Sequence, residues 1–314
     1  KAHAGVMWAV ALASNISGIW ILTANGFMQH PVGYTIREGR AELTSFVDLV
    51  FNYHGLLEII HVLPAGLLLA SFFIMGISAY HLLKKQHIEV FTRSFKIAVT
   101  VALVSSIAVA VVGDFQGVNT AKNQPAKLAA MEAHWETQKR APIVLFALPL
   151  EHREENAFEI GRIPGILSFL GFHDFDAEVI GLKDIPEDER PPVLPVFVGF
   201  RTMVGIGTLL ILLAAYGFIK RNNIAEQTGL LKILLWSIPL PYIAMEAGWV
   251  VAEVGRQPWI VYGVLKTANA ASPIHGGQVL LSLFGFMAVY GLLGAIGFYL
   301  IAKYAKEGPE AVTN

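Results

Sequence analysis

Six long stretches that contain no lysine or arginine, and one acidic residue among them, dominate this sequence of 314 residues. Each is close to or above the roughly 18–20 apolar residues that a helix needs to cross a membrane. In lipid, only helices and closed barrels satisfy their own backbone hydrogen bonds. We therefore expect an all-α, polytopic transmembrane helical bundle with six spans, within residues 2–36, 59–83, 97–113, 202–219, 233–252 and 267–302.

The composition excludes several classes of protein. Charged residues make up 15% of the chain and hydrophobic residues 54%, too little charge to cover the surface of a soluble protein. The net charge of −1 offers nothing that attracts nucleic acid, so we expect no such partner. The absence of cysteine excludes disulfides, thiolate zinc sites, iron–sulfur clusters and thiol catalysis.

The lysines and arginines of the short loops predict the orientation of the spans. They gather after spans two, four and six, whereas the opposite short loops carry few. Because cytoplasmic loops are enriched in these residues, we expect both termini in the cytoplasm. The expected organisation is spans one to three in 1–113, an extracytoplasmic loop in 114–194, spans four to six in 195–305 and a cytoplasmic tail in 306–314.

The loop 114–194 is the one long polar segment. Loops of this length without regular structure are uncommon and are often functional. Residues 124–137 have a helix-forming composition, so we expect a helix inside the loop.

Three possible iron ligands lie at similar depth on three predicted spans. With a rise of 1.5 Å per residue, His61 lies about 10 Å below the outer surface, and Met203 and Glu253 fall in the same layer. Ionisable groups inside a membrane are costly and are usually functional. A histidine and a methionine on facing helices can hold a haem iron from both sides, and a glutamate can ligate another iron. Arg201 and Arg256, at the outer rim of the layer, suit haem propionates.

Each of these residues also has a simpler interpretation. A single intramembrane histidine is commonly a hydrogen-bonded packing residue, and Met203 could fill a gap in the core. Glu253 and Arg256 could form a local ion pair, worth a few tenths of a kcal/mol at this spacing. The shared depth favours the haem interpretation without establishing it.

Several runs of uncommon sequence are spread along the chain. They are Ser14-Asn15, Ala24-Asn25-Gly26, KLAAMEAHWET at 127–137, FRTMV at 200–204, EAGWVVAE at 246–253 and GRQPW at 255–259. In these runs the chain resembles subunit I of the cytochrome bd-type quinol oxidases. The similarity extends from the first residues to about residue 305.

The resemblance implies roles in haem binding. Residues of the family that match His61 and Met203 are the axial ligands of a low-spin b haem. A glutamate that matches Glu253 ligates the high-spin b haem of a di-haem site, and a tryptophan that matches Trp249 lies between the haems. Arginines that lie by the haems match Arg201 and Arg256.

The resemblance also implies a quinol site and a proton route. The loop 114–194 matches the family's external quinol-binding loop, in which residues that match Lys127 and Glu132 take part in quinol oxidation. Polar residues of a proposed proton route match Ser17 and Asn25. The implied activity is oxidation of ubiquinol or menaquinol at the outer face and reduction of oxygen at the di-haem site.

The family's pattern is not matched in full. This chain corresponds to the C-terminal two-thirds of the family's subunit, so we expect the N-terminal spans to be missing here or to lie on a separate chain. Those spans carry the ligand of the third haem, of d or b type, so we expect the isolated chain to be incomplete. The resemblance also implies subunit II, a small single-span subunit and a bacterial or archaeal cytoplasmic (inner) membrane.

Two other functions stay open from the sequence. The chain could be an electron-transfer or quinol-binding membrane subunit without oxygen reduction, truncated or split. It could also be a transporter with a midplane histidine and glutamate. The location of the ligand-type residues in one outer layer argues against the transporter.

Overall fold

The structure, a computed structural model, describes residues 2–309. It confirms the predicted fold class, because these residues form six helical segments long and apolar enough to cross a membrane. The segments are α1 (Ala2–Gln29), α3 (Tyr53–Leu83), α4 (Ile88–Asn123), α7 (Val193–Lys220), the pair α8 (Thr228–Trp236) and α9 (Leu240–Val254), and α10 (Gly276–Glu307).

The third span is much longer than the uncharged run 97–113 that predicted it. Helix α4 continues to Asn123, so its last turns project into the segment expected to be loop. The helix ends where Gln124 adopts φ −140° and ψ 64° before Pro125. A residue that precedes proline is disfavoured in the helical region, which explains the position of this end.

The fifth span is broken into two helices. Helix α8 ends at Trp236 and α9 begins at Leu240, immediately after Pro239 and just before Pro241. Proline lacks a backbone N–H and cannot continue the hydrogen-bond pattern of a helix interior. At the break, the Ser237 hydroxyl donates to the carbonyl of Leu234 at 2.8 Å.

The core lies among α3, α4, α7 and α8. Phe72, Met75 and Phe95 are fully buried there. A Cβ on Gly217 of α7 would lie 3.1 Å from the Val99 side chain of α4, so glycine lets these two helices approach closely. This bundle forms a rigid frame beside which the candidate site lies.

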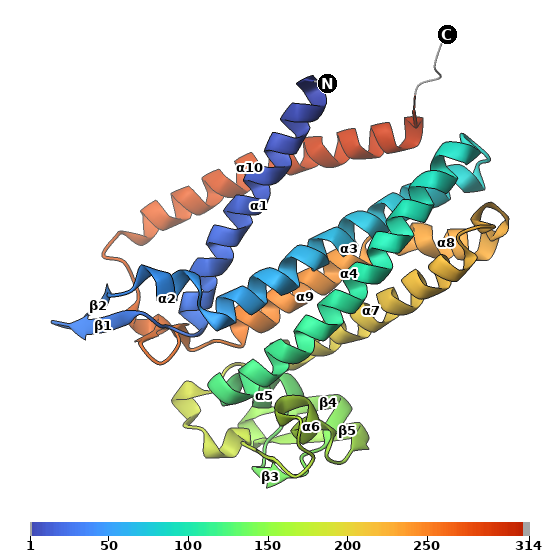
Figure 1. Cartoon of the computed structure of the whole chain (residues 1–314). Coiled ribbons are helices and arrows are strands. Elements are labelled where there is room, and N and C mark those ends of the chain that lie inside the picture. The colour runs from blue at the N-terminus through green and yellow to red at the C-terminus, as the bar shows by residue number, and fades with distance from the viewer. Residues whose placement is uncertain (1, 310–314) are drawn as a thin grey trace.

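Helices α1 and α10 lie apart from the bundle over most of their length, although the Ala305 carbonyl near the end of α10 lies 2.8 Å from Nε2 of His81 on α3 (Figure 1). The buried residues of α1 all lie in its C-terminal third, between Leu22 and Gln29. There a Cβ on Gly26 would lie 2.4 Å from the Cα of Gly55 on α3, so the two backbones are in contact. Helix α10 has no buried residue. Its apolar surface and the first part of α1 are therefore free to face lipid or a partner chain.

The predicted loop is a small folded layer at one end of the bundle (Figure 1). The expected helix within 124–137 is present as α5, which ends at Glu132 before Ala133 in the left-handed region. An antiparallel hairpin follows, with a register shift between Ala147 and Pro149. The layer contains α5 (Pro125–Glu132), β3 (Gln138–Lys139), β4 (Ile143–Leu150), β5 (Glu155–Ile163), α6 (Ile166–Phe172), β6 (Glu178–Val179) and three 3₁₀ turns, Glu151–Arg153, Leu182–Asp184 and Glu187–Glu189.

Short elements complete the same end of the molecule. One hairpin and a short helix follow α1, and a second hairpin follows α9. These elements are β1 (Tyr34–Arg37), β2 (Arg40–Leu43), α2 (Phe46–Val50), β7 (Trp259–Val261), β8 (Leu265–Lys266) and the 3₁₀ turn Thr267–Asn269; a further 3₁₀ turn, Ile224–Glu226, joins α7 to α8.

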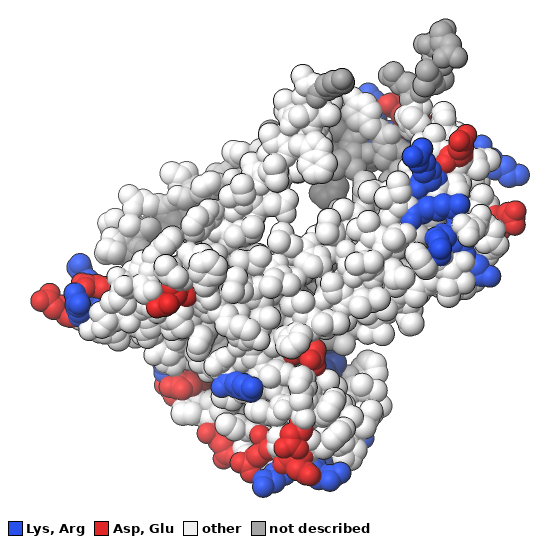
Figure 2. All heavy atoms as spheres, viewed as in Figure 1, with Lys and Arg blue, Asp and Glu red and all other residues white. Residues whose placement is uncertain are grey.

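Charge is concentrated at the two ends of the molecule. Figure 2 shows lysine and arginine gathered at one end of the bundle, acidic and basic groups mixed over the loop layer, and an uncharged band between them. The basic end includes the α3–α4 turn with Lys84 and Lys85 and the end of α7 with Lys220 and Arg221. An uncharged band between two charged ends is the distribution that a membrane-spanning bundle requires.

Candidate functional site

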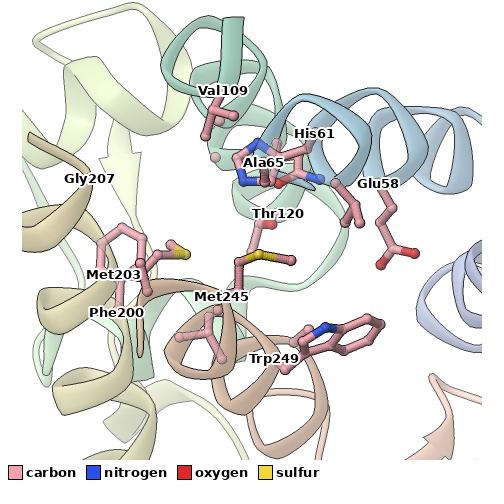
Figure 3. Close-up of a pocket in the computed structure, with 18 of the residues that line it drawn as sticks. Glu58, His61, Ala65, Val109, Thr120, Phe200, Met203, Gly207, Met245 and Trp249 are labelled. Carbon is pink, nitrogen blue, oxygen red and sulfur yellow. The ribbon is translucent and has the colours of Figure 1, made fainter. Parts of the chain in front are cut away.

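A pocket lies where α3, α4, α7 and α9 meet, below the loop helix α5. Its space between atoms is about 1360 Å³, counting the part open to the outside. His61 lines it from α3, Met203 from α7 and Trp249 from α9 (Figure 3). The depth argument placed His61 and Met203 in one layer, and the structure brings both side chains into one pocket.

Glycines leave room around both predicted ligands. A Cβ on Gly248 would lie 3.0 Å from the sulfur of Met203, and one on Gly113 would lie 3.5 Å from Cε1 of His61. The Nδ1 atom of His61 is buried and has no hydrogen-bond partner. This atom lies on the α4 side of the ring, 3.9 Å from a Cβ placed on Gly113.

The arrangement suits haem better than a bare metal ion. Within residues 2–309, no group of three or more His, Asp or Glu could hold an ion, and the chain has no cysteine. A haem iron takes most of its ligands from the macrocycle and needs only one or two from the protein. An imidazole and a thioether on facing walls of an apolar pocket meet that need.

Met245 is a pocket residue that the sequence interpretation missed. It lines the same space from α9, four residues before Trp249 and so on the same helix face (Figure 3). The pocket is therefore lined by three methionines, Met131, Met203 and Met245. The spacing from Trp249 was the available signal for Met245.

Glu253 does not line the pocket of His61 and Met203. It lies on another face of α9, where Asn25 of α1 donates a hydrogen bond of 2.5 Å to its Oε1. Arg256 donates one of 2.6 Å to its Oε2, which is the local pair considered as the simpler interpretation. The predicted ligand is thus close to α1, with both oxygens occupied by neighbouring side chains.

Arg256 has more donors than the protein satisfies. The residue is 3% exposed, yet its Nε and one terminal nitrogen are buried without a hydrogen-bond partner. Unpaired buried donors on a guanidinium fit a carboxylate such as a haem propionate, which accepts two hydrogen bonds at once. The expectation for Arg256 is therefore consistent with the geometry around it.

Lys127 reaches the pocket from the loop layer. Its amine donates a hydrogen bond of 2.6 Å to Oε1 of Gln29, at the end of α1. Gln29 in turn donates to Oδ1 of Asn25 at 3.3 Å, so a polar chain runs from Lys127 toward Glu253. Burial lowers the pKa of Lys127 to about 7, with Glu58 and Glu253 opposing the drop and Arg256 adding to it. This lysine can lose and regain its proton near neutral pH.

Glu132 and Arg201 form a buried ion pair instead of facing the pocket. The guanidinium donates to Oε1 of Glu132 at 3.2 Å and to Oε2 at 2.5 Å. It also donates to the carbonyl of Val144 on β4 at 2.7 Å. Burial raises the pKa of the Glu132 carboxyl, and the guanidinium of Arg201 opposes the rise. Arg201 therefore ties span α7 to two elements of the loop layer.

The remaining predicted residues are separate from one another. Ser17 lies on the exposed part of α1, whereas Asn25 contacts Glu253. The sequence interpretation overlooked Glu58, which lines the pocket together with His54. Glu58 stands one position before the uncharged run 59–83, and a scan for uncharged segments passes over it.

Comparison with known proteins assigns the chain to a family. Residues 1–309 match the model of the family described as cytochrome bd terminal oxidase subunit I. The chain is 38% identical to "Cytochrome bd ubiquinol oxidase subunit 1" of Bacillus subtilis (strain 168), over 99% of this chain and 69% of that protein. It is 35% identical to "Cytochrome bd-II ubiquinol oxidase subunit 1" of Escherichia coli (strain K12), over 99% of this chain and 74% of the relative.

A solved structure has the same fold. The bd oxidase from Geobacillus thermodenitrificans matches with a TM-score of 0.85 and 34% identity, over 96% of this chain and 69% of that one. Fold, sequence and family model agree over nearly the whole chain. The chain belongs to the cytochrome bd terminal oxidase subunit I family of membrane quinol oxidases.

Proposed function

We propose that His61 and Met203 are the axial ligands of a low-spin b haem in the pocket. The observation that carries the proposal is their position on facing helices of one pocket, with glycine beside each side chain. A haem bound there supplies a one-electron redox centre. The residues of this chain orient that centre and exclude water from it, because the pocket walls are largely apolar.

Glu253 and Arg256 serve a second haem, a high-spin b haem, on the α1 side of α9. The unpaired donors of Arg256 support this assignment, since they match a propionate. Asn25 would hold the carboxylate of Glu253 through the hydrogen bond already present. A third haem, of d or b type, would complete the di-haem site at which oxygen is reduced.

Quinol is proposed to bind at the outer face, beside Lys127 and under the loop layer. Lys127 supports the proposal because its buried amine reaches the pocket and can change its charge near neutral pH. In that position it donates a hydrogen bond to a quinol oxygen. Glu132 keeps the predicted role in quinol oxidation, and its ion pair with Arg201 holds α5 above the pocket.

The proposed location is a bacterial or archaeal cytoplasmic (inner) membrane, with the loop layer outside and both termini inside. The basic end of the bundle in Figure 2 supports this orientation, because cytoplasmic loops are rich in lysine and arginine. The exposed apolar surfaces of α10 and α1 support contact with subunit II and a small single-span subunit.

A spectrum and an oxygen electrode test the proposal together. The purified oxidase complex that contains this chain should show a low-spin b haem reduced by quinol, and it should consume oxygen when quinol is added. His61→Ala should remove that low-spin signal. If quinol reduced the haem but the complex consumed no oxygen, the alternative of an electron-transfer subunit without oxygen reduction would be supported.

A further inference from the structure

We propose that Glu58 accepts a proton from quinol in the pocket and that His54 is its positioning residue. The inference rests on the proposed quinol site, and it assigns a residue to the proton transfer there. The evidence is the geometry of one side-chain pair at the outer end of α3.

Glu58 presents an unpaired carboxylate oxygen inside the pocket. Its side chain is 12% exposed, and Oε2 is buried without a hydrogen-bond partner. Its other oxygen, Oε1, lies 3.3 Å from Nε2 of His54. Both residues line the pocket, and Figure 3 shows the carboxylate of Glu58 pointing into it on the side where Trp249 lies.

Asn119 of α4 sets the state of the His54 ring. The amide nitrogen of Asn119 lies 2.6 Å from Nδ1 of His54, and the amide oxygen of Asn119 is occupied by a hydrogen bond from Asn123 at 2.8 Å. In this orientation Nδ1 is an acceptor, so the proton of a neutral ring is on Nε2. Nε2 lies beside Oε1 of Glu58, at 3.3 Å, which leaves Oε2 for a ligand.

No other carboxylate among residues 2–309 lines this pocket. Both oxygens of Glu132 receive hydrogen bonds from Arg201, and those of Glu253 receive them from Asn25 and Arg256. A general base must reach the proton that it takes with a free lone pair. Glu58 meets that requirement where quinol would contact Lys127.

The pair is more than a local helix contact. A His and a carboxylate four residues apart on an exposed helix stabilise the helix only slightly. That interaction does not explain why one oxygen is kept buried without a partner, which is costly. A cost of this kind in a pocket is typical of a site that binds and reacts.

The proton balance is simple. Oxidation of one quinol to quinone releases two electrons, which the oxidase activity passes on toward oxygen, and two protons. One hydroxyl proton goes to Oε2 of Glu58 as its O–H bond breaks. Glu58 then passes a proton outward past His54, one turn nearer the outer end of α3, and is free for the second proton.

The test uses Glu58→Gln in the complete oxidase complex. Glutamine keeps the size of the side chain, but it cannot take a proton. We expect kcat for quinol oxidation to fall on the order of 100-fold, the usual size of such a contribution, with little change in KM. The low-spin haem spectrum and the rate of haem reduction by dithionite should not change.

Two further variants make the result decisive. Glu58→Asp, which restores a carboxylate, should recover part of the lost kcat. Glu246→Gln makes the same chemical change on α9 outside the pocket, at a surface between α7 and α9, and should keep wild-type turnover. Unchanged turnover in Glu58→Gln, loss of its haem spectrum, or no recovery in Glu58→Asp would overturn the role of Glu58. A wild-type complex that does not oxidise quinol would instead overturn the proposed function.

Discussion

The guanidinium of Arg201 holds both carboxylate oxygens of Glu132, at 3.2 and 2.5 Å. Arg201 belongs to the span α7, two residues before Met203, whereas Glu132 ends the loop helix α5. The pair therefore joins the outer layer to the helix that carries a proposed haem ligand. Its side chains are 15% and 3% exposed, so solvent screens the pair little.

Glu132→Gln should reduce quinol oxidation while the haem spectrum persists. The substitution leaves the charge of Arg201 buried without its partner, which loosens α5 above the pocket. Turnover with quinol in the complete complex measures the effect. A double-mutant cycle with Arg201→Gln should give a coupling free energy of about 0.5–3 kcal/mol in thermal inactivation. Normal turnover in Glu132→Gln would contradict the role.

Met203→Leu should convert the low-spin haem to a high-spin or weakly ligated form. The substitution removes the sulfur but preserves the volume of the side chain. Met245→Leu is the matched control, because Met245 lines the same pocket and should leave the reduced spectrum unchanged. If Met245→Leu changed the spectrum and Met203→Leu did not, the ligand would be Met245 and not Met203.

Glu253→Ala should remove the high-spin b haem signal and spare the low-spin one. The two sites lie on different faces of α9, since Glu253 contacts α1 and does not line the pocket of His61. Difference spectra of the reduced complex distinguish the two haems. If the high-spin signal survives in Glu253→Ala, only the ion pair with Arg256 remains as a role for this carboxylate.

Lys127→Met should make stability less dependent on pH between about 7 and 10.5. The folded state holds the lysine with a pKa of about 7, whereas the unfolded chain keeps the ordinary value of 10.5. In that window the unfolded state binds more protons than the folded state. The free energy of unfolding of the wild type therefore increases as pH rises. Between pH 7 and 9 the gain is at most about 2.7 kcal/mol.

The measurement is thermal inactivation of the wild type and of Lys127→Met at those two pH values. Other groups titrate equally in both proteins, so the difference between their pH shifts isolates Lys127. Equal shifts in the two proteins would show that the lysine keeps its proton in the folded state.

Single cysteines can test the orientation, because the chain has none of its own. Lys85→Cys in the exposed α3–α4 turn should react with a membrane-impermeant maleimide only after the cells are opened. Asp174→Cys, exposed in the loop layer, should react in intact cells. The reverse pattern would invert the predicted topology.

The membrane bundle could be predicted from the sequence because the six spans contain almost no charged residues. Depth placed His61, Met203 and Glu253 in one layer, but it does not give the rotation of a helix about its axis. The sequence alone could therefore not show that His61 and Met203 line one pocket or that Glu253 faces α1.

Other parts of the site depend on contacts between distant segments. Lys127 meets Gln29 only because α5 folds back onto the end of α1, and no local pattern indicates that contact. The break between α8 and α9 does have a signal in the sequence, because Pro239 and Pro241 mark it. Glu58 was missed because it borders an uncharged run and so was treated as the end of a span.

The contact between Gly26 and Gly55 holds the outer end of α1 directly against the backbone of α3. The buried residues of α1 all lie in its outer third, where the two backbones leave no space for even a methyl group. Asn25 and Gln29 lie on either side of this contact. Asn25 binds Glu253 and Gln29 binds Lys127, two residues of the proposed chemistry. An alanine at position 26 would displace both amides at once. A glycine without a functional side chain thus sets the positions of the two residues that bind Glu253 and Lys127.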